Sequence, residues 1–214
     1  MKTFLMIGMG NFGHLLAREF VKQQCELMVV DCREEALEDL LTLGVSAKIG
    51  DCTNPEVLSS FDVPSFDACF VSVGGNFQTS LEIVSLLKEL GAAKIYCKAE
   101  NDVQEKFLRL IGAHHIIYPE RQAARSLAIS ESNDSIFDCI PMSGDYSVYE
   151  VATPAAWLGK SLRQVNVRSV YSLNILAIVR DGTSDMMPSP DYIFNARDHL
   201  MVLGTPVNIA RMIR

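Results

Sequence analysis

The chain has 214 residues, of which 49% are hydrophobic and 21% charged, and its formal net charge at pH 7 is −7. This length allows one large domain or two small ones, and the negative charge argues against nonspecific nucleic-acid binding, which needs a basic surface. No apolar run approaches the roughly 20 residues that cross a bilayer. Met1 and Lys2 lead straight into a predicted strand, which leaves no room for a signal peptide. We therefore expect a cytoplasmic protein.

The first segment carries a glycine pattern between an apolar run and a helical period. The pattern is Gly8-Met9-Gly10-Asn11-Phe12-Gly13, and a second apolar run, Leu-Met-Val-Val, ends 18 residues later on Asp31. In a dinucleotide-binding fold the first glycine makes the turn, the second admits a pyrophosphate and the third packs helix on strand. The helix start adds unpaired N–H groups and a partial positive charge. The carboxylate of Asp31 is placed to accept from ribose hydroxyls, and its charge disfavours NADP relative to NAD, ADP or ATP.

Strand and helix patterns continue to alternate after this fingerprint. Six strands that alternate with helices predict a Rossmann-like, doubly wound parallel sheet over residues 1–118. The predicted strands after the second are Ser46–Gly50, Ala68–Val73, Lys94–Lys98 and His115–Tyr118, and the predicted helices are Phe12–Gln23, Glu34–Leu43, Pro55–Phe61, Phe77–Leu90 and Val103–Ile111.

The pattern changes after the sixth strand. Residues 119–134 read as a crossover helix with a stripe of small residues, a candidate dimer contact, followed by a polar linker. Beyond them, shorter strands and denser turn signals predict a small α+β domain over residues 135–214. Its predicted elements are the strands Ile136–Met142, Ser147–Thr153, Asn174–Arg180 and Leu200–Leu203, a helix Leu158–Val165 and a last helix from Val207.

Polar residues follow the strands of the predicted sheet, at the edge where such folds bind ligands. The carboxylate of Asp51 can accept a hydrogen bond from the amino group of adenine. The alternative is that Asp51 forms the N-cap or an Asx turn before the next helix. Asn76, after Gly74 and Gly75, caps a helix or touches a phosphate. Lys98 supplies a charge near the phosphates or is a solvated lysine. The sixth strand is followed by Glu120 and Arg121.

The sequence contains no recognisable arrangement of catalytic residues. A nicotinamide dehydrogenase needs a proton donor or acceptor beside its substrate, yet no Tyr-x-x-x-Lys pair follows the fourth strand, and His199 reads as part of a turn. The six cysteines form no Cys-x-x-Cys pair, which predicts reduced thiols rather than a zinc site or disulfides. A small NAD-dependent oxidoreductase stays the alternative to a binding protein.

Taken together, the motifs resemble the cytosolic regulatory subunits of bacterial Ktr/Trk-type potassium uptake systems, the RCK-domain family. The first domain matches in GMGNFG, VVD, GDCT, SVGGN, CKAEN and IGAHHIIYPER, at residues 8–13, 29–31, 50–53, 72–76, 97–101 and 111–121. The second matches in LGKSLRQVNVRSVYSLNILAIVRDG, MPSPD and ARDHLMVLGT, at residues 158–182, 187–191 and 196–205. The resemblance covers essentially the whole chain.

This resemblance implies a protein without chemistry of its own. Such subunits form homodimers that assemble as a ring under a membrane potassium-translocating subunit, at the inner face of the membrane. There, the exchange of ADP for ATP, or of NAD for NADH, biases the gate of the membrane subunit. Such a bias requires that the protein make different contacts with the two ligands. The nucleotide-binding residues expected here are Gly8, Gly10, Asn11, Phe12, Gly13, Asp31, Asp51, Cys52, Gly74, Asn76, Lys98 and Arg121.

The resemblance also implies two further ligands. Glu120 offers a carboxylate for a divalent cation between paired subunits. Arg168, Asn174, Ile175 and Pro190 are similar to a dimer-interface pocket for cyclic di-AMP, unless Arg168 is merely solvated and Asn174 makes a turn. In one respect this chain departs from the family, because members that sense the ATP γ-phosphate often carry arginine where Asn11 stands. A neutral amide cannot make the forked contact of a guanidinium, which gives weight to NAD(H), ADP or AMP.

Overall fold

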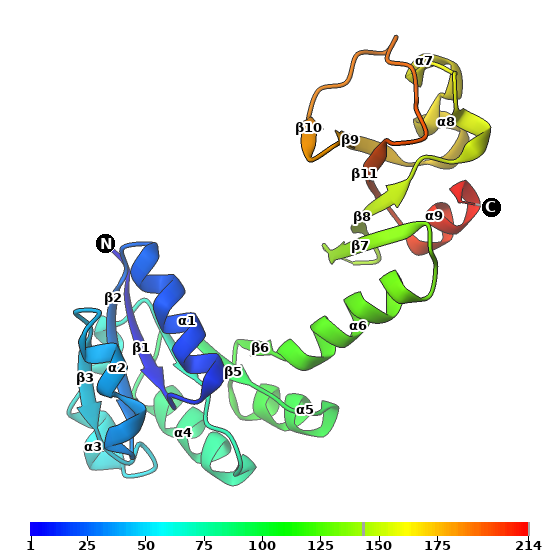
Figure 1. The fold of residues 1–214 in the computed structure, drawn as a ribbon. Coiled ribbons are helices and arrows are strands. Elements are labelled where there is room, and N and C mark those ends of the chain that lie inside the picture. The colour runs from blue at the N-terminus through cyan, green and yellow to red at the C-terminus, as the bar shows by residue number, and fades with distance from the viewer. Residues whose placement is uncertain (143, 214) are drawn as a thin grey trace. The chain divides into compact units, whose positions relative to one another are not determined.

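The computed structural model describes residues 1–142 and 144–213. The chain divides into two compact units, Met1–Pro119 and Glu120–Arg214 (Figure 1). Within the described residues, no helix combines the length and the apolar character that a membrane span requires.

The first unit is a six-stranded parallel sheet in the order β3-β2-β1-β4-β5-β6. This is the Rossmann strand order, in which the connections change direction between β1 and β4. The predicted doubly wound sheet is therefore confirmed. Its strands are β1 Thr3–Ile7, β2 Glu26–Asp31, β3 Ser46–Ile49, β4 Ala68–Val71, β5 Ile95–Lys98 and β6 His115–Ile117.

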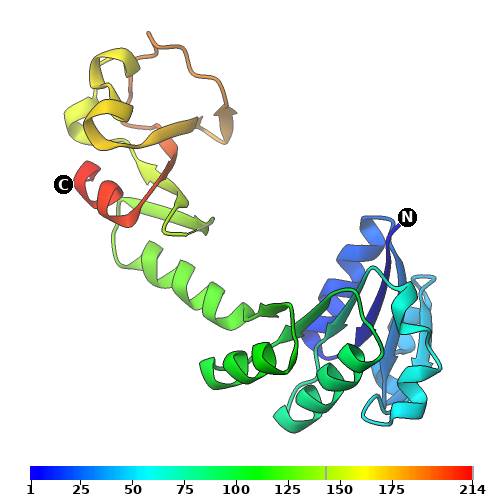
Figure 2. The ribbon, with the colours of Figure 1, turned by 180° about the vertical axis from the view of Figure 1, so that it is seen from behind.

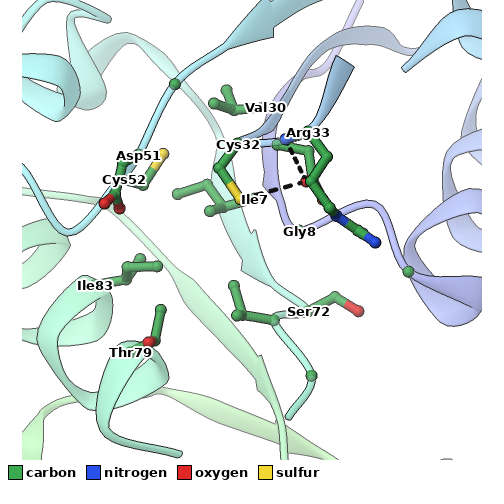
Figure 3. A pocket seen from close by; sticks show the side chains of 15 residues that line it. Ile7, Gly8, Val30, Cys32, Arg33, Asp51, Cys52, Ser72, Thr79 and Ile83 are labelled. Carbon is green, nitrogen blue, oxygen red and sulfur yellow. Dashed lines mark hydrogen bonds and ion pairs between the residues drawn. The ribbon is translucent and has the colours of Figure 1, made fainter. Parts of the chain in front are cut away.

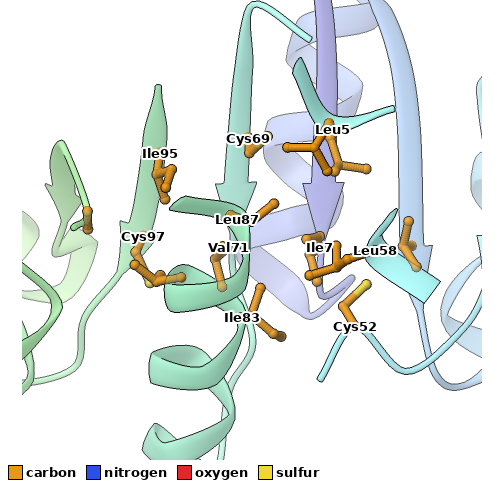
Figure 4. Packing of buried hydrophobic residues seen from close by; sticks show 14 of the residues in the cluster. Leu5, Ile7, Cys52, Leu58, Cys69, Val71, Ile83, Leu87, Ile95 and Cys97 are labelled. Atoms are coloured by element: carbon orange, nitrogen blue, oxygen red, sulfur yellow. The ribbon is translucent and has the colours of Figure 1, made fainter. Parts of the chain in front are cut away.

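Helices cover both faces of this sheet, and Figures 1 and 2 show α1 on one side and α4 with α5 on the other. On one face Leu5 and Ile7 of β1 pack with Ile83 and Leu87 of α4 (Figure 4). On the other face Phe4 and the remaining alternate residues of β1 and β2 pack against α1 and α2. The helices are α1 Asn11–Lys22, α2 Glu38–Leu41, α3 Pro55–Ser59, α4 Phe77–Glu89 and α5 Asp102–Ile111.

One predicted helix of this unit is wrong. The segment 34–43 is a 3₁₀ turn, Glu34–Ala36, followed by the single-turn helix α2. The backbone N–H groups of Leu37 and Leu40 bond to carbonyl groups three residues back, and Leu37 has φ −115°. Leu37 and Leu40 are buried, as the helical period of the sequence predicts. The 3₁₀ turn nevertheless prevents one continuous helix over this segment.

The second unit contains α6 Pro119–Glu131, most of which belongs to it, and a five-stranded antiparallel sheet in the order β10-β9-β11-β8-β7. Val151, Ile178, Leu200 and Val202 of this sheet pack with Trp157, the single tryptophan of the chain. The edge strands are β10 and β7. The other elements are β7 Ile136–Pro141, β8 Ser147–Ala152, α7 Leu162–Val165, α8 Val167–Tyr171, β9 Asn174–Arg180, β10 Thr183–Asp185, β11 His199–Gly204 and α9 Pro206–Met212.

The predicted helix Leu158–Val165 is also wrong at its start. Leu158 has φ −56° and ψ 130°, which is not helical, Gly159 has φ +76°, and the helix begins only after Ser161. Ser161 and Gln164 form a capping box, each side chain bonding the other's backbone N–H. This Ser-x-x-Gln spacing is a helix-start signal that the sequence already contained, and α8 and β10 were not predicted at all.

Candidate functional site

A cleft opens at the carboxyl ends of β1, β2 and β4, where the strand order of the first unit reverses. Its volume is about 290 Å³, near the lower end of the roughly 300–1,000 Å³ typical of small-molecule sites. Apolar side chains alternate with polar ones around it (Figure 3). The lining residues are Ile7, Gly8, Gly10, Val30, Asp31, Cys32, Arg33, Gly50, Asp51, Cys52, Ser72, Val73, Gly74, Thr79 and Ile83.

The glycines of the fingerprint meet three different surroundings. Gly8 has φ +90°, and a Cβ there would lie 2.8 Å from the backbone of Ser72 and Val73. A Cβ on Gly13 would lie 2.4 Å from the carbonyl oxygen of Gly8. A Cβ on Gly10 would meet nothing within 4 Å. Gly8 and Gly13 are thus required by packing, whereas the space above Gly10 is open to a ligand.

The start of α1 adds hydrogen-bond donors at the same place. Gly10 is the N-cap of α1, and it has no side chain with which to bond the first N–H groups of the helix. The first turn also carries no acidic residue. Such a helix start attracts an anion, because its N–H groups and the helix dipole both favour negative charge. The surroundings of Gly10 therefore fit a pyrophosphate.

Asp31 closes β2 on the adjacent wall and is 7% exposed. Its Oδ2 accepts from the backbone N of Met9 at 2.8 Å, and its Oδ1 accepts from the backbone N and Nε of Arg33 at 3.0 and 3.2 Å. Burial by itself raises the pKa of Asp31, but these bonds outweigh it and hold the pKa below its ordinary value of 3.8. Asp31 is therefore a charged and firmly oriented acceptor at neutral pH.

The opposite wall contains Asp51 and Cys52. Asp51 accepts from the backbone N and the hydroxyl of Thr53, at 2.9 and 2.8 Å, and so forms an Asx turn. The N-cap of α3 is Asn54, so Asp51 does not cap that helix. Cys52 is buried, which raises the pKa of its thiol to about 12. Asp51 still faces the cleft, and its predicted contact with adenine stays a prediction.

Other predicted residues lie beside this cleft rather than in it. Asn11 and Phe12 form the first turn of α1. Asn76 caps α4 by accepting from Gln78 N at 3.0 Å, and with Lys98 it lines a separate, small cavity. Glu120 and Arg121 belong to the second unit. Contacts of these residues with a ligand stay predictions.

The sequence analysis missed four polar cleft residues: Cys32, Arg33, Ser72 and Thr79. Cys32 and Arg33 directly follow Asp31, and Ser72 directly follows β4. Their positions at strand ends could have identified them, because ligands bind at that edge. Thr79 sits in the first turn of α4, and no sequence signal separates it from an ordinary helix residue. None of the lining residues of the described cleft is a histidine, tyrosine or lysine.

A second cavity, of about 500 Å³, lies in the second unit. It brings together all four residues that the resemblance grouped, and Arg168 Nε donates to Asn174 Oδ1 at 2.9 Å. Asn174 thus begins β9 rather than making a turn. The lining residues are Leu162, Arg163, Asn166, Val167, Arg168, Leu173, Asn174, Ile175 and Pro190.

The loop that supplies Pro190 to this cavity is anchored by a buried carboxylate that the sequence analysis missed. Asp198 is fully buried and accepts from Arg180 Nε at 2.7 Å, from the Tyr192 hydroxyl at 2.9 Å and from Asn195 N at 2.8 Å. Burial acts to raise the pKa of Asp198, but these bonds hold it below its ordinary value. The loop is also bonded through Pro190 O, which accepts from Arg163 N at 2.8 Å.

His199 begins β11 and pairs with Glu150 at 2.9 Å, so the predicted turn is wrong. In the described part of the chain, no group of three or more histidine, cysteine, aspartate or glutamate residues is arranged to hold a metal ion. The six cysteines are free thiols, as the sequence predicts.

Two family models match the chain, the TrkA-N domain over residues 4–119 and the TrkA-C domain over residues 147–214. Ktr system potassium uptake proteins C and A of Bacillus subtilis (strain 168) are 32% and 33% identical to it over 210 residues, which cover 98% of this chain and 95% of each relative. Among solved structures, the GsuK channel bound to NAD matches with a TM-score of 0.72 and 18% identity, over 100% of this chain and 39% of that one. The structural match concerns the fold alone.

Proposed function

The chain belongs to the TrkA-N and TrkA-C domain family that includes the Ktr system potassium uptake proteins, and on this basis we propose that it is a nucleotide-binding regulatory subunit of a potassium uptake system. The predicted family is thereby confirmed. The ligand we propose for the first unit is an adenine nucleotide, NAD(H) or ADP in preference to ATP.

The open space over Gly10 carries this proposal. It lies at the start of α1, where N–H groups face an incoming anion, and it shares one cleft with the charged Asp31. In a dinucleotide-binding fold the pyrophosphate lies at the helix start and the ribose at the acidic residue that ends the second strand, and Gly10 and Asp31 occupy these two positions here. The apolar Val30, Ile7 and Ile83 offer a surface for the base. The NAD reported with the GsuK channel, which shares this fold, agrees with that ligand.

We further propose that the second cavity takes cyclic di-AMP. Arg168 offers a guanidinium to a phosphate, which matches the planar, bidentate geometry that arginine favours. Asn174 and Ile175 offer an amide and an apolar surface to an adenine, and Pro190 closes the site from the anchored loop. The Arg168–Asn174 hydrogen bond sets the two side chains in place before any ligand arrives.

The family relationship also supports a proposal for the assembly. We propose a homodimer, arranged in a ring of dimers, that works in the cytoplasm against the membrane potassium-translocating subunit of the system. The exposed side chains Val103, Phe107 and Leu110 form an apolar stripe along α5 that a second copy would cover. Glu120 would hold a divalent cation together with the partner's groups, since the described residues of one chain contain no cluster of three or more metal-ligating side chains.

The test of the nucleotide site is a thermal-shift and calorimetry panel with ATP, ADP, AMP, NAD, NADH and cyclic di-AMP. A ligand that binds only the folded protein raises the melting temperature by mass action. We expect ADP or NAD to raise it, and we expect D31N to weaken that nucleotide by about tenfold or more, because an amide NH2 cannot accept from ribose. The matched control is D39N, an exposed aspartate bonded to Arg18. Folded wild-type protein that binds none of the adenine nucleotides would refute the proposal.

A further inference from the structure

Asp31 is already well occupied by donors from the chain itself. Its Oδ1 accepts two N–H groups of Arg33, and Cys32 Sγ lies 3.7 Å from the same oxygen. Its Oδ2 accepts from Met9 N. An ionised carboxylate has about four acceptor positions. The four donors named above already occupy these positions, and a ribose that presents both of its hydroxyl groups needs two of them, so two donors must leave. The Cys32 thiol is a weak donor and is one of the two.

Among these N–H donors, the Arg33 side chain is the one that can leave at low cost. The N–H groups of Met9 and Arg33 belong to the backbone of the glycine turn and of the segment after β2, whereas the Arg33 side chain is 63% exposed. Its bond to Asp31 is long, at 3.2 Å, and uses Nε alone. Within residues 1–142 and 144–213, no hydrogen bond from Nη1 or Nη2 of Arg33 is found. A ribose hydroxyl can therefore replace Nε on Oδ1 while the rest of the turn stays fixed.

The displaced guanidinium stays in the cleft. Figure 3 shows the Arg33 side chain on the side of Gly8, across the cleft from Asp51 and Cys52. It follows Asp31 by two residues, so it lies at the edge where Asp31 would hold the ribose. A cation at this edge attracts a phosphate on the 2′ oxygen, and the fork of a guanidinium matches phosphate oxygens bidentately. Asp31 alone predicts exclusion of NADP, but Arg33 supplies the opposite charge beside it.

We propose that Arg33 is the residue that sets ribose specificity in this cleft: it holds Asp31 in the free protein, yields Oδ1 to a ribose hydroxyl, and donates its outer nitrogens to a 2′-phosphate. The inference rests on the proposed nucleotide site and deepens it. It assigns the cleft a second class of ligand, 2′-phosphorylated adenine nucleotides.

The experiment measures the affinities of the full chain for NAD and NADP by calorimetry, because the two differ only in the 2′-phosphate. We expect the wild type to bind both within about tenfold of each other, and we expect R33Q to lose NADP affinity by about tenfold or more relative to NAD. R33K keeps the charge but not the fork, so we expect an intermediate ratio. R109Q is the matched control: Arg109 also bonds a carboxylate, that of Glu105 at 2.9 Å, but it does not line the cleft.

The outcomes separate the two proposals. An unchanged NAD-to-NADP ratio in folded R33Q overturns the role of Arg33 and leaves the nucleotide site standing, as does a wild type that rejects NADP by more than about a hundredfold. Wild-type protein that binds neither NAD, NADP nor ADP overturns both proposals. Circular dichroism of each variant confirms folding, which we expect to be unaffected because the Arg33 side chain is mostly exposed.

Discussion

In the first unit the candidate site is made largely of backbone, whereas the cavity of the second unit is made of side chains. The cleft over Gly10 depends on a helix start, three glycines and one buried carboxylate, all fixed by the parallel sheet. The second cavity depends on Arg168, Asn174 and a loop that reaches Pro190. The backbone site tolerates no side chain at Gly8 or Gly13 without strain, because a Cβ at either position would lie closer than 3 Å to backbone atoms. The side-chain cavity depends instead on hydrogen bonds that hold its parts together.

The largest effect that would test this contrast is expected from G8A. A methyl group at φ +90° adds strain of roughly 1–3 kcal/mol, and its 2.8 Å contacts with the Ser72 and Val73 backbone add overpacking. We expect a loss of about 3 kcal/mol in the unfolding free energy of the first unit. The measurement is thermal unfolding by circular dichroism, read together with the fluorescence of Trp157, which lies in the second unit.

The matched control for G8A is G10A. Its methyl group enters open space at φ −77°, so we expect stability within about 0.5 kcal/mol of the wild type. Nucleotide affinity should nevertheless fall, because the methyl group fills the space that a pyrophosphate would use. If G8A shifted the Trp157 transition as much as the rest of the signal, the two units would not be separable in stability.

How far the sequence predicts this molecule differs between the same two regions. The fingerprint specified the sheet, the glycine turn and Asp31, because each depends on residues close in sequence and on a fixed backbone geometry. The interruption at Leu37 depends on a local 3₁₀ turn that hydrophobic periodicity does not register. Asp198 looked like one polar residue of a turn, since its partner Arg180 lies 18 residues earlier in β9 and Tyr192 lies six residues earlier in the same loop. Only the folded chain brings those groups together.

The next largest effect is expected from D198N, which tests whether hydrogen bonds hold the second cavity. The variant leaves Arg180 and Tyr192 without their charged acceptor. Because the Arg180 side chain is 43% exposed, we expect a cost of about 2 kcal/mol, below that of a fully buried pair. Denaturant unfolding followed by Trp157 fluorescence reports on this unit directly. A loss below about 0.5 kcal/mol would show that the loop is held by other contacts.

The same variant has a pH signature. The pKa of Asp198 is lower in the folded protein than its ordinary value of 3.8. Its contribution is therefore fully present above that value and is lost as the pH falls through the folded pKa. Wild-type stability in the second unit should decline in this acid range, and D198N should show a flatter profile there. A wild type and D198N with parallel profiles would contradict the assignment.

The smallest effect on stability is expected from R168A. This variant compares the two regions by their ligand affinities rather than by their unfolding free energies. Arg168 is exposed, so we expect unfolding free energy within about 0.5 kcal/mol of the wild type. Cyclic di-AMP affinity should fall by about tenfold or more with loss of the guanidinium, and the shift produced by ADP or NAD should stay unchanged. Calorimetry checks both, with the exposed R197A as control. An equal loss of affinity for cyclic di-AMP and for ADP or NAD would mean that both kinds of ligand bind at one site.

The open edge of the second sheet has a consequence for handling the protein. The edge strand β10 is short and its residues are exposed and polar, but β7 has six residues and exposes Phe137 and Ile140. In the described sheet, β7 pairs with β8 on one side only, and a strand edge of this kind is a template for another chain. Ser126 Oγ already donates to Cys139 O of β7 at 2.8 Å, and the charge of Asp138 and the missing N–H of Pro141 further oppose such pairing. We therefore expect aggregation during refolding to start at β7, and replacement of Asp138 by an apolar residue to lower the concentration at which the protein precipitates.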